Sequence, residues 1–139
     1  MVDKAIPTIT AGTKPDGTEE VHVVQGVNSR RLTTQQITDI GASIITDATT
    51  ARILAIGDAG RWIRFTNAGS ITCTINTGIF SANDEIMFEQ VGTGAITYTA
   101  GGGFTLRSNG GLIISNGQNS VQGMKFISGT DAILFGNLV

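Results

Sequence analysis

RWIRFTNAGSITCTI, residues 61–75, opens the stretch that decides the fold, and this stretch continues as far as Phe135. Within residues 71–75, apolar side chains take the odd positions and threonines the even ones. Strands are expected at residues 51–56, 60–67, 71–75, 85–91, 95–99, 104–107, 112–114, 123–127 and 132–135. A two-residue period with turn residues at regular spacing is typical of an antiparallel sandwich or barrel. The sequence therefore predicts an all-β, jelly-roll-like body domain over residues 51–139.

Residues 1–50 predict an extended N-terminal arm that carries a small β-turn-β-helix module. Pro7 and Pro15 restrict its first part to extended and turn conformations, because proline cannot donate to a strand ladder. Residues 20–25 alternate as one short strand. One short helix is expected at residues 33–41, where a capping box precedes a glycine C-cap. Residues 42–50 suit either a short strand or a linker.

The chain is poor in charge, which bears on its partners. Charged residues make up 14% of the 139 residues, against roughly 25% in an average soluble domain. Because a freely exposed monomer usually carries more charge on its outer strand faces, this composition favours self-association over a monomer coated with Thr, Ser and Asn. The net charge is −2 and no Lys/Arg cluster is present, which argues against a nucleic-acid partner.

Membrane insertion and secretion are not expected either. No apolar run approaches the roughly 20 residues that are needed to span a bilayer. No signal-type apolar core follows Met1, so synthesis in a reducing cytosol is expected. Cys73 is the only cysteine and falls on the apolar phase of its strand, so it is interpreted as a small buried hydrophobe.

Groups that could support catalysis or bind a metal are sparse. His22 is the only histidine, and its alternation with valines indicates a surface or interface position rather than a catalytic one. Residues 83–85 with Glu89 form the densest acidic cluster, which could supply oxygen ligands to a hard cation, but a solvated strand face is favoured. Glu19-Glu20 and Asp58 make no stronger site. We therefore predict no enzyme, no catalytic residue, no cofactor and no metal.

Two further features are weighed against a ligand-binding role. A phosphate loop is followed by Lys-Ser/Thr or by a helix. Neither follows the glycine clusters Gly92-Thr93-Gly94 and Gly101-Gly102-Gly103. Positive φ angles or a close approach of backbones between strands explain these glycines better. The aromatic residues mostly fall on the core phase of their strands. Only Trp62 and Tyr98 are expected to expose an edge on which a sugar could stack.

A recurring order of turn glycines and strand residues supports a resemblance to known proteins. In the body it comprises residues 59–67, 71–75, 85–97, 104–108, 111–112 and 135–138. In the first part it comprises residues 16–26 and 31–37. With these patterns the chain resembles tailed-bacteriophage virion proteins, whose tail-fibre, head-fibre and decoration-type members share such a β-domain. The resemblance implies a homotrimer, non-enzymatic assembly and a place on the outer surface of the particle.

These observations predict a capsid decoration (cement) protein, a homotrimer that bridges subunits of the major capsid protein. Residues 1–40 are expected to anchor it, with residues 1–13 lying along the capsid or a neighbouring chain, and the strands after Gly92 are expected to form the trimer contact. The alternative is a short tail-fibre or head-fibre module that binds host-surface glycan and attaches to a tail protein. A small hydrolase would need His22 or the acidic cluster at residues 84–89.

Overall fold

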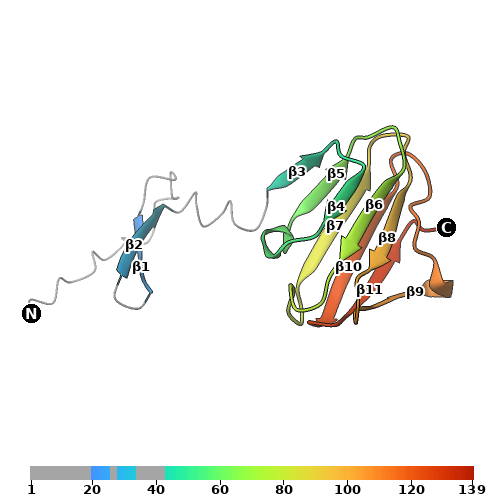
Figure 1. Cartoon of the computed structure of the whole chain (residues 1–139). Helices are drawn as coiled ribbons and strands as arrows, with labels where there is room; N and C mark the ends of the chain where they lie inside the picture. The colour runs from blue at the N-terminus through green and yellow to red at the C-terminus, as the bar shows by residue number, and fades with distance from the viewer. Residues whose placement is uncertain (1–19, 26–27, 34–42) are drawn as a thin grey trace, which may run out of the picture. The chain divides into compact units, whose positions relative to one another are not determined.

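The computed structural model describes residues 20–25, 28–33 and 43–139. The chain divides into two units, residues 1–40 and 41–139 (Figure 1). In the first unit, β1 (Glu20–Gln25) and β2 (Asn28–Thr33) form an antiparallel hairpin. The strand predicted at residues 20–25 is therefore confirmed. Thr33 ends β2, while the rest of the predicted helix lies outside the described residues and stays a prediction.

The second unit is a parallel β-solenoid of about three turns. Its turns are built by β3 (Ile44–Asp47), β4 (Ala51–Ile53), β5 (Trp62–Phe65), β6 (Ile71–Ile75), β7 (Glu85–Gln90) and β8 (Ile96–Ala100). β3, β5 and β7 pair in parallel in one sheet, and β4, β6 and β8 pair in parallel in the other. Each turn thus gives one strand to each sheet. Of the two alternatives for residues 42–50, the structure shows the strand.

The last strands close the solenoid beyond its third turn. β10 (Val121–Ser128) and β11 (Asp131–Gly136) form a hairpin whose first strand runs antiparallel to β7. β9 (Thr105–Ser108) pairs in parallel with β11, so the larger sheet has the order β3-β5-β7-β10-β11-β9. The free edge of β8 is covered by residues 113–115, because Tyr98 N donates to Ile113 O at 2.9 Å. Two 3-10 helices, η1 (Ile56–Asp58) and η2 (Asn109–Gly111), lie in the connections.

The prediction of an all-β fold is confirmed, but the antiparallel sandwich or barrel is wrong. Consecutive solenoid strands lie in different sheets, and each pairs in parallel with the strand one turn away. Parallel strands are usually covered on both faces and then read as continuous apolar runs. Here the outer faces carry no covering helices in the described part of the chain, so the strands alternate as antiparallel ones do. A two-residue period therefore could not distinguish the two arrangements.

The core lies between the two sheets and is built mainly from the inward side chains of β5, β6, β7, β8, β10 and β11. Its fully buried members are the following: Ile63, Phe65, Cys73, Ile75, Ile86, Phe88, Ile96, Tyr98, Met124, Phe126 and Ala132. Phe88 packs between Phe65 and Tyr98, with ring centroids at 6.4 and 5.1 Å. The predicted burial of Cys73 is confirmed, and this burial raises the pKa of its thiol to about 12. Apart from Tyr98, for which an exposed edge was expected, these inward positions are as the sequence predicts, whereas the strand pairing is not.

Candidate interaction surface

The acidic residues of the cluster at residues 84–89 have separate partners, and two of them form ion pairs. Glu85 is exposed and accepts from Lys125 Nζ at 2.9 Å, while Glu89 accepts from Arg64 Nε at 2.8 Å. Asp84 caps a turn by accepting from a backbone N–H. No three His, Cys, Asp or Glu side chains come together as a metal site among the described residues. The predicted solvated face is therefore a face of ion pairs.

The structure also shows where His22 and the glycines of the cluster at residues 92–94 lie. His22 lies in β1 opposite Arg31, and Glu19 lies outside the described residues. A Cβ atom on Gly94 would lie 1.9 Å from the carbonyl oxygen of Gly69. At Gly92 it would lie 2.1 Å from a backbone oxygen of the same preceding loop. The prediction that these glycines allow a close approach of backbones is confirmed.

The two aromatic candidates differ in their positions. Tyr98 is fully buried, so the expectation of an exposed edge is wrong for this residue. Thr97 and Thr99 lie on the outward side of β8, so the side chain of Tyr98 between them points into the core. The Tyr98 hydroxyl donates to Gln122 Oε1 at 3.1 Å. Burial raises the pKa of Tyr98 well above its ordinary value. Trp62 is half-buried on the outer face of β5, as expected.

Trp62 belongs to a line of apolar side chains that crosses the outer face of the six-stranded sheet. The strand registers place Ile44 opposite Trp62, Trp62 opposite Met87, Met87 opposite Gly123, and Gly123 opposite Phe135. Ile44 is 62% exposed and Phe135 47% exposed. The Phe135 ring lies over Gly123, where a Cβ atom would meet it at 2.3 Å. We call these five residues the apolar row.

Charged pairs flank the apolar row on both sides. Arg64 and Glu89 form one flank, and Glu85 and Lys125 form the other. Trp62 Nε1 also donates to Glu89 Oε2 at 3.2 Å, which ties the row to its flank. The hydrogen bond from Arg64, aided by that from Trp62, lowers the pKa of Glu89 against the opposing effect of burial. With strands about 4.8 Å apart, the row spans roughly 19 Å.

Two hollows adjoin the apolar row, one beside Trp62 and Met87 within the row and one at its Phe135 end. One has a volume of about 260 Å³ and is lined by Gly60, Arg61, Trp62, Glu85 and Met87. The other has about 380 Å³ and is lined by Asn109, Leu112, Ile133, Leu134, Phe135, Gly136 and Leu138. The first brings an aromatic ring, a guanidinium and a carboxylate together. The second is lined mostly by apolar residues, but a large part of its surface is polar.

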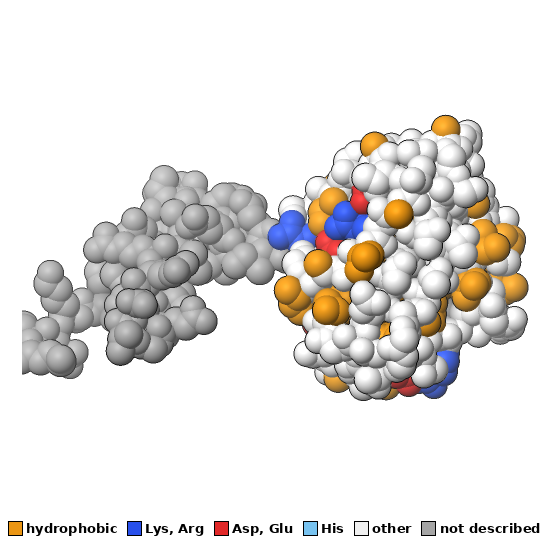
Figure 2. All heavy atoms as spheres, viewed as in Figure 1, with side chains coloured by type: hydrophobic (Ala, Val, Ile, Leu, Met, Phe, Trp, Pro, Cys, Tyr) orange, Lys and Arg blue, Asp and Glu red, His pale blue; other side chains and the backbone are white. Residues whose placement is uncertain are grey.

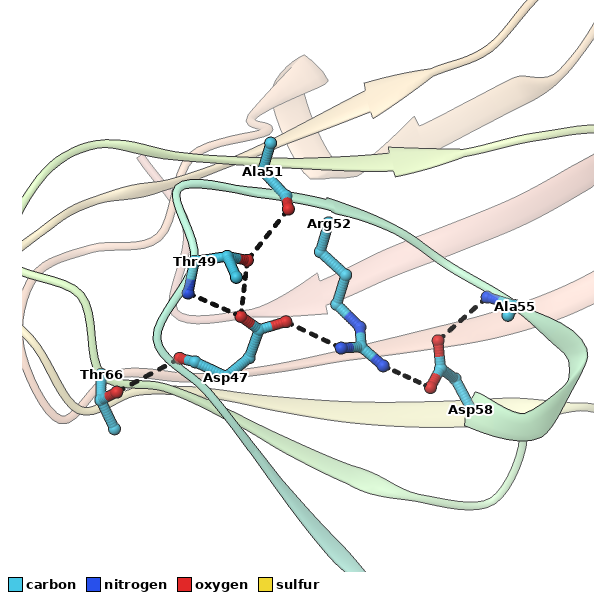
Figure 3. A network of polar contacts seen from close by, with 7 residues as sticks. All are labelled: Asp47, Thr49, Ala51, Arg52, Ala55, Asp58 and Thr66. Atoms are coloured by element: carbon cyan, nitrogen blue, oxygen red, sulfur yellow. Dashed lines mark hydrogen bonds and ion pairs between the residues drawn. The ribbon is translucent and has the colours of Figure 1, made fainter.

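The sequence reasoning missed a network of charges in the first solenoid turn (Figure 3). Arg52 donates from Nη1 to Asp47 at 2.7 Å and from Nη2 to Asp58 at 2.6 Å. Thr49 donates to Asp47 from both its N–H and its hydroxyl, and Ala55 N donates to Asp58. Although burial opposes it, the hydrogen bonds from Thr49 and Arg52 lower the pKa of Asp47. The sequence feature that could have revealed this network is Arg52, an arginine at the inward-facing position of a short apolar strand.

Comparisons with known proteins leave the chain without an assigned family. No protein-family model matches it, and no curated protein matches its sequence. Within the described residues, no helix is both long and apolar enough to cross a membrane.

Proposed function

We propose that this chain is a non-enzymatic structural protein of a phage virion, a homotrimer that attaches to the outside of the head as a decoration protein. The apolar row is the observation that carries the proposal. Protein interfaces typically combine an apolar centre, rich in Trp, Met and aromatic residues, with a polar rim. Trp62, Met87 and Phe135 supply such a centre, and the flanking ion pairs supply such a rim.

In this role the apolar row would dock on subunits of the major capsid protein. A stable interface buries about 1,200–2,000 Å² in total, which exceeds what one row of side chains provides. Residues 1–40 would add the remaining contact as an anchoring region. Because several copies of the row act together in a homotrimer, weak single contacts would combine into firm attachment. Linking neighbouring capsid subunits in this way would strengthen the head.

Locating the protein on the particle tests the proposal. Immunogold labelling, with the copy number from quantitative mass spectrometry, should show hundreds of copies spread over the head. A few dozen copies or fewer at the tail or at one vertex would contradict a decoration role.

The role of the apolar row is tested by adding purified protein to particles that lack it. Met87→Glu should abolish attachment, because it places a charge in the centre of the row. Ala82→Glu is the matched control, since it adds the same charge at an exposed loop position away from the row. Equal attachment of both variants would exclude the row as the docking surface.

The alternative function is a short fibre module that binds host-surface glycan. The hollow beside Trp62 favours it, because Arg61 and Glu85 lie next to an aromatic ring on which a sugar could stack. Host glycan should then protect the protein from thermal unfolding, and Trp62→Ala should remove this protection. Protection that persists in Trp62→Ala, or no protection by any host glycan, would exclude this hollow as a glycan site.

A further inference from the structure

Arg61 differs from the other basic residues of the solenoid unit. Within residues 43–139, each of the other four forms an ion pair with a carboxylate: Arg52, Arg64, Arg107 and Lys125. Figure 2 shows such pairing on the face that it presents, where Asp and Glu side chains lie beside Lys and Arg side chains. Among the described residues of this unit, Arg61 is thus the one cation without a carboxylate partner.

The guanidinium of Arg61 is also incompletely hydrogen-bonded. Its Nη1 donates to the Ser43 hydroxyl, whereas its Nε is buried and has no partner among the described residues. Arg52 Nε lacks a partner too, but both terminal nitrogens of Arg52 hold carboxylates. A buried donor without a hydrogen bond is unfavourable, and native proteins satisfy most such groups. The guanidinium of Arg61 is therefore held in place with donors that the folded chain leaves unused.

Arg61 lines the hollow beside Trp62, which has a volume of about 260 Å³. Sites for whole small molecules usually measure about 300–1,000 Å³, so this hollow suits a single side chain or group. Trp62 and Met87 give it apolar walls. Glu85 lines it as well, but its carboxylate already accepts from Lys125 at 2.9 Å. The hollow thus combines apolar surface with one cation that has no counter-charge.

We propose that this hollow binds the carboxylate of an Asp or Glu side chain on the partner to which the apolar row docks. Charge complementarity selects this occupant, because a carboxylate supplies the counter-charge that Arg61 lacks. The Nε–H and one Nη2–H bond of a guanidinium point the same way, so the two oxygens of a carboxylate match them. Trp62 and Met87 belong to both the hollow and the row, which makes the two surfaces continuous. The inference rests on the proposed function and names the chemistry of the partner at one point of the interface.

A titration of the purified full chain with propionate, the side-chain analogue of Glu, tests the site without the particle. In proton–nitrogen NMR spectra, propionate should shift the Nε–H signal of Arg61, whereas propionamide, the uncharged analogue of Gln, should not. Arg107 is the matched control, because its Nε already donates to Asp131 at 3.0 Å. Equal shifts with the two compounds, or shifts at Arg61 no larger than at Arg107, would overturn the inference. Tighter binding of glucuronate than of propionate would assign the hollow to an acidic sugar and would overturn it as well.

Attachment to particles that lack the protein tests the source of the carboxylate. Arg61→Gln removes the charge and should weaken attachment by roughly tenfold, and Arg61→Lys should restore part of it. Arg107→Gln should attach like the wild type, because it removes a charge that is already paired. Equal attachment of Arg61→Gln and Arg107→Gln would overturn the inference.

The two measurements separate this inference from the proposed function. A wild-type protein that does not attach to particles would contradict the proposed function, while the propionate titration would still decide whether the hollow takes a carboxylate. The titration uses the wild type, so it also decides the question if Arg61→Gln does not fold.

Discussion

Removing the Arg52 guanidinium should destabilise the solenoid more than any single surface substitution. Arg52→Ala deletes the cation that pairs with Asp47 at 2.7 Å and with Asp58 at 2.6 Å. The three side chains are 20%, 7% and 5% exposed, so water replaces the lost partner poorly. The two carboxylates keep their donors from Thr49 and Ala55, which limits the loss.

The magnitude follows from these contacts. Breaking a buried ion pair by removing one partner costs about 3–5 kcal/mol, and the partial exposure of Arg52 places the expected loss near the lower end, about 3 kcal/mol. For a unit of this size, each kcal/mol lowers the Tm by about 4–8 °C. The Tm should therefore fall by roughly 12–24 °C. Urea unfolding followed by circular dichroism measures the change in the free energy of unfolding.

Arg107→Ala is the matched control, because it removes the same group from a more exposed ion pair. Arg107 is 53% exposed and pairs with Asp131, and surface pairs of this kind contribute about 0–1 kcal/mol. If Arg52→Ala lowered the free energy of unfolding no more than Arg107→Ala does, the reasoning would be refuted.

The same variant changes the expected response to acid. In the wild type the folded-state pKa of Asp47 is lowered, so its stabilising effect is present above the ordinary carboxyl pKa of about 3.9 and is lost as the pH falls through the folded-state value. Arg52→Ala removes one of the contacts that lower the pKa of Asp47, while burial, which raises it, stays. The folded-state pKa of Asp47 is therefore higher in the variant than in the wild type. Arg52→Ala should therefore lose less stability than the wild type between pH 7 and pH 3. Parallel pH profiles for the two proteins would contradict this assignment.

Two further predictions concern the packing of the core and its connections. Gly94→Ala should destabilise the fold by about 1–3 kcal/mol through overpacking against the Gly69 carbonyl, whereas Gly102→Ala, which meets no atom within 4 Å, should be nearly neutral in urea unfolding. Tyr98→Phe should cost about 1–3 kcal/mol, because Gln122 Oε1 loses its buried donor; a change below a few tenths would contradict that role.

The inward and outward phases of the strands could be predicted from the sequence, but their partners could not. β6 has the bounds expected for it, residues 71–75, and Cys73 points inward as predicted. Alternation reports which side chains face the core, and it is the same for parallel and antiparallel neighbours. The pairing depends on which strands lie in the same sheet. That information resides in the connections, whose turn residues resemble those of hairpins.

The apolar row could not be read from the sequence for the same reason. Ile44, Trp62, Met87 and Phe135 belong to four strands that the chain visits at distant points, and only the registers align them. The exposed edge expected for Tyr98 was wrong, because its ring lies in the core and its hydroxyl donates to the buried Gln122 side chain. A polar side chain at an inward-facing strand position thus indicates a buried hydrogen-bond partner.

The closure of both solenoid ends limits how copies of this unit can assemble. At the first turn, Asp47, Arg52 and Asp58 fill the inward positions, so a further turn stacked there would cover charges instead of apolar surface. Beyond the third turn, the β10–β11 hairpin covers β7, and residues 113–115 cover β8. Growth along the solenoid axis is therefore disfavoured at both ends. The contacts that remain are lateral, through the outer faces of the two sheets.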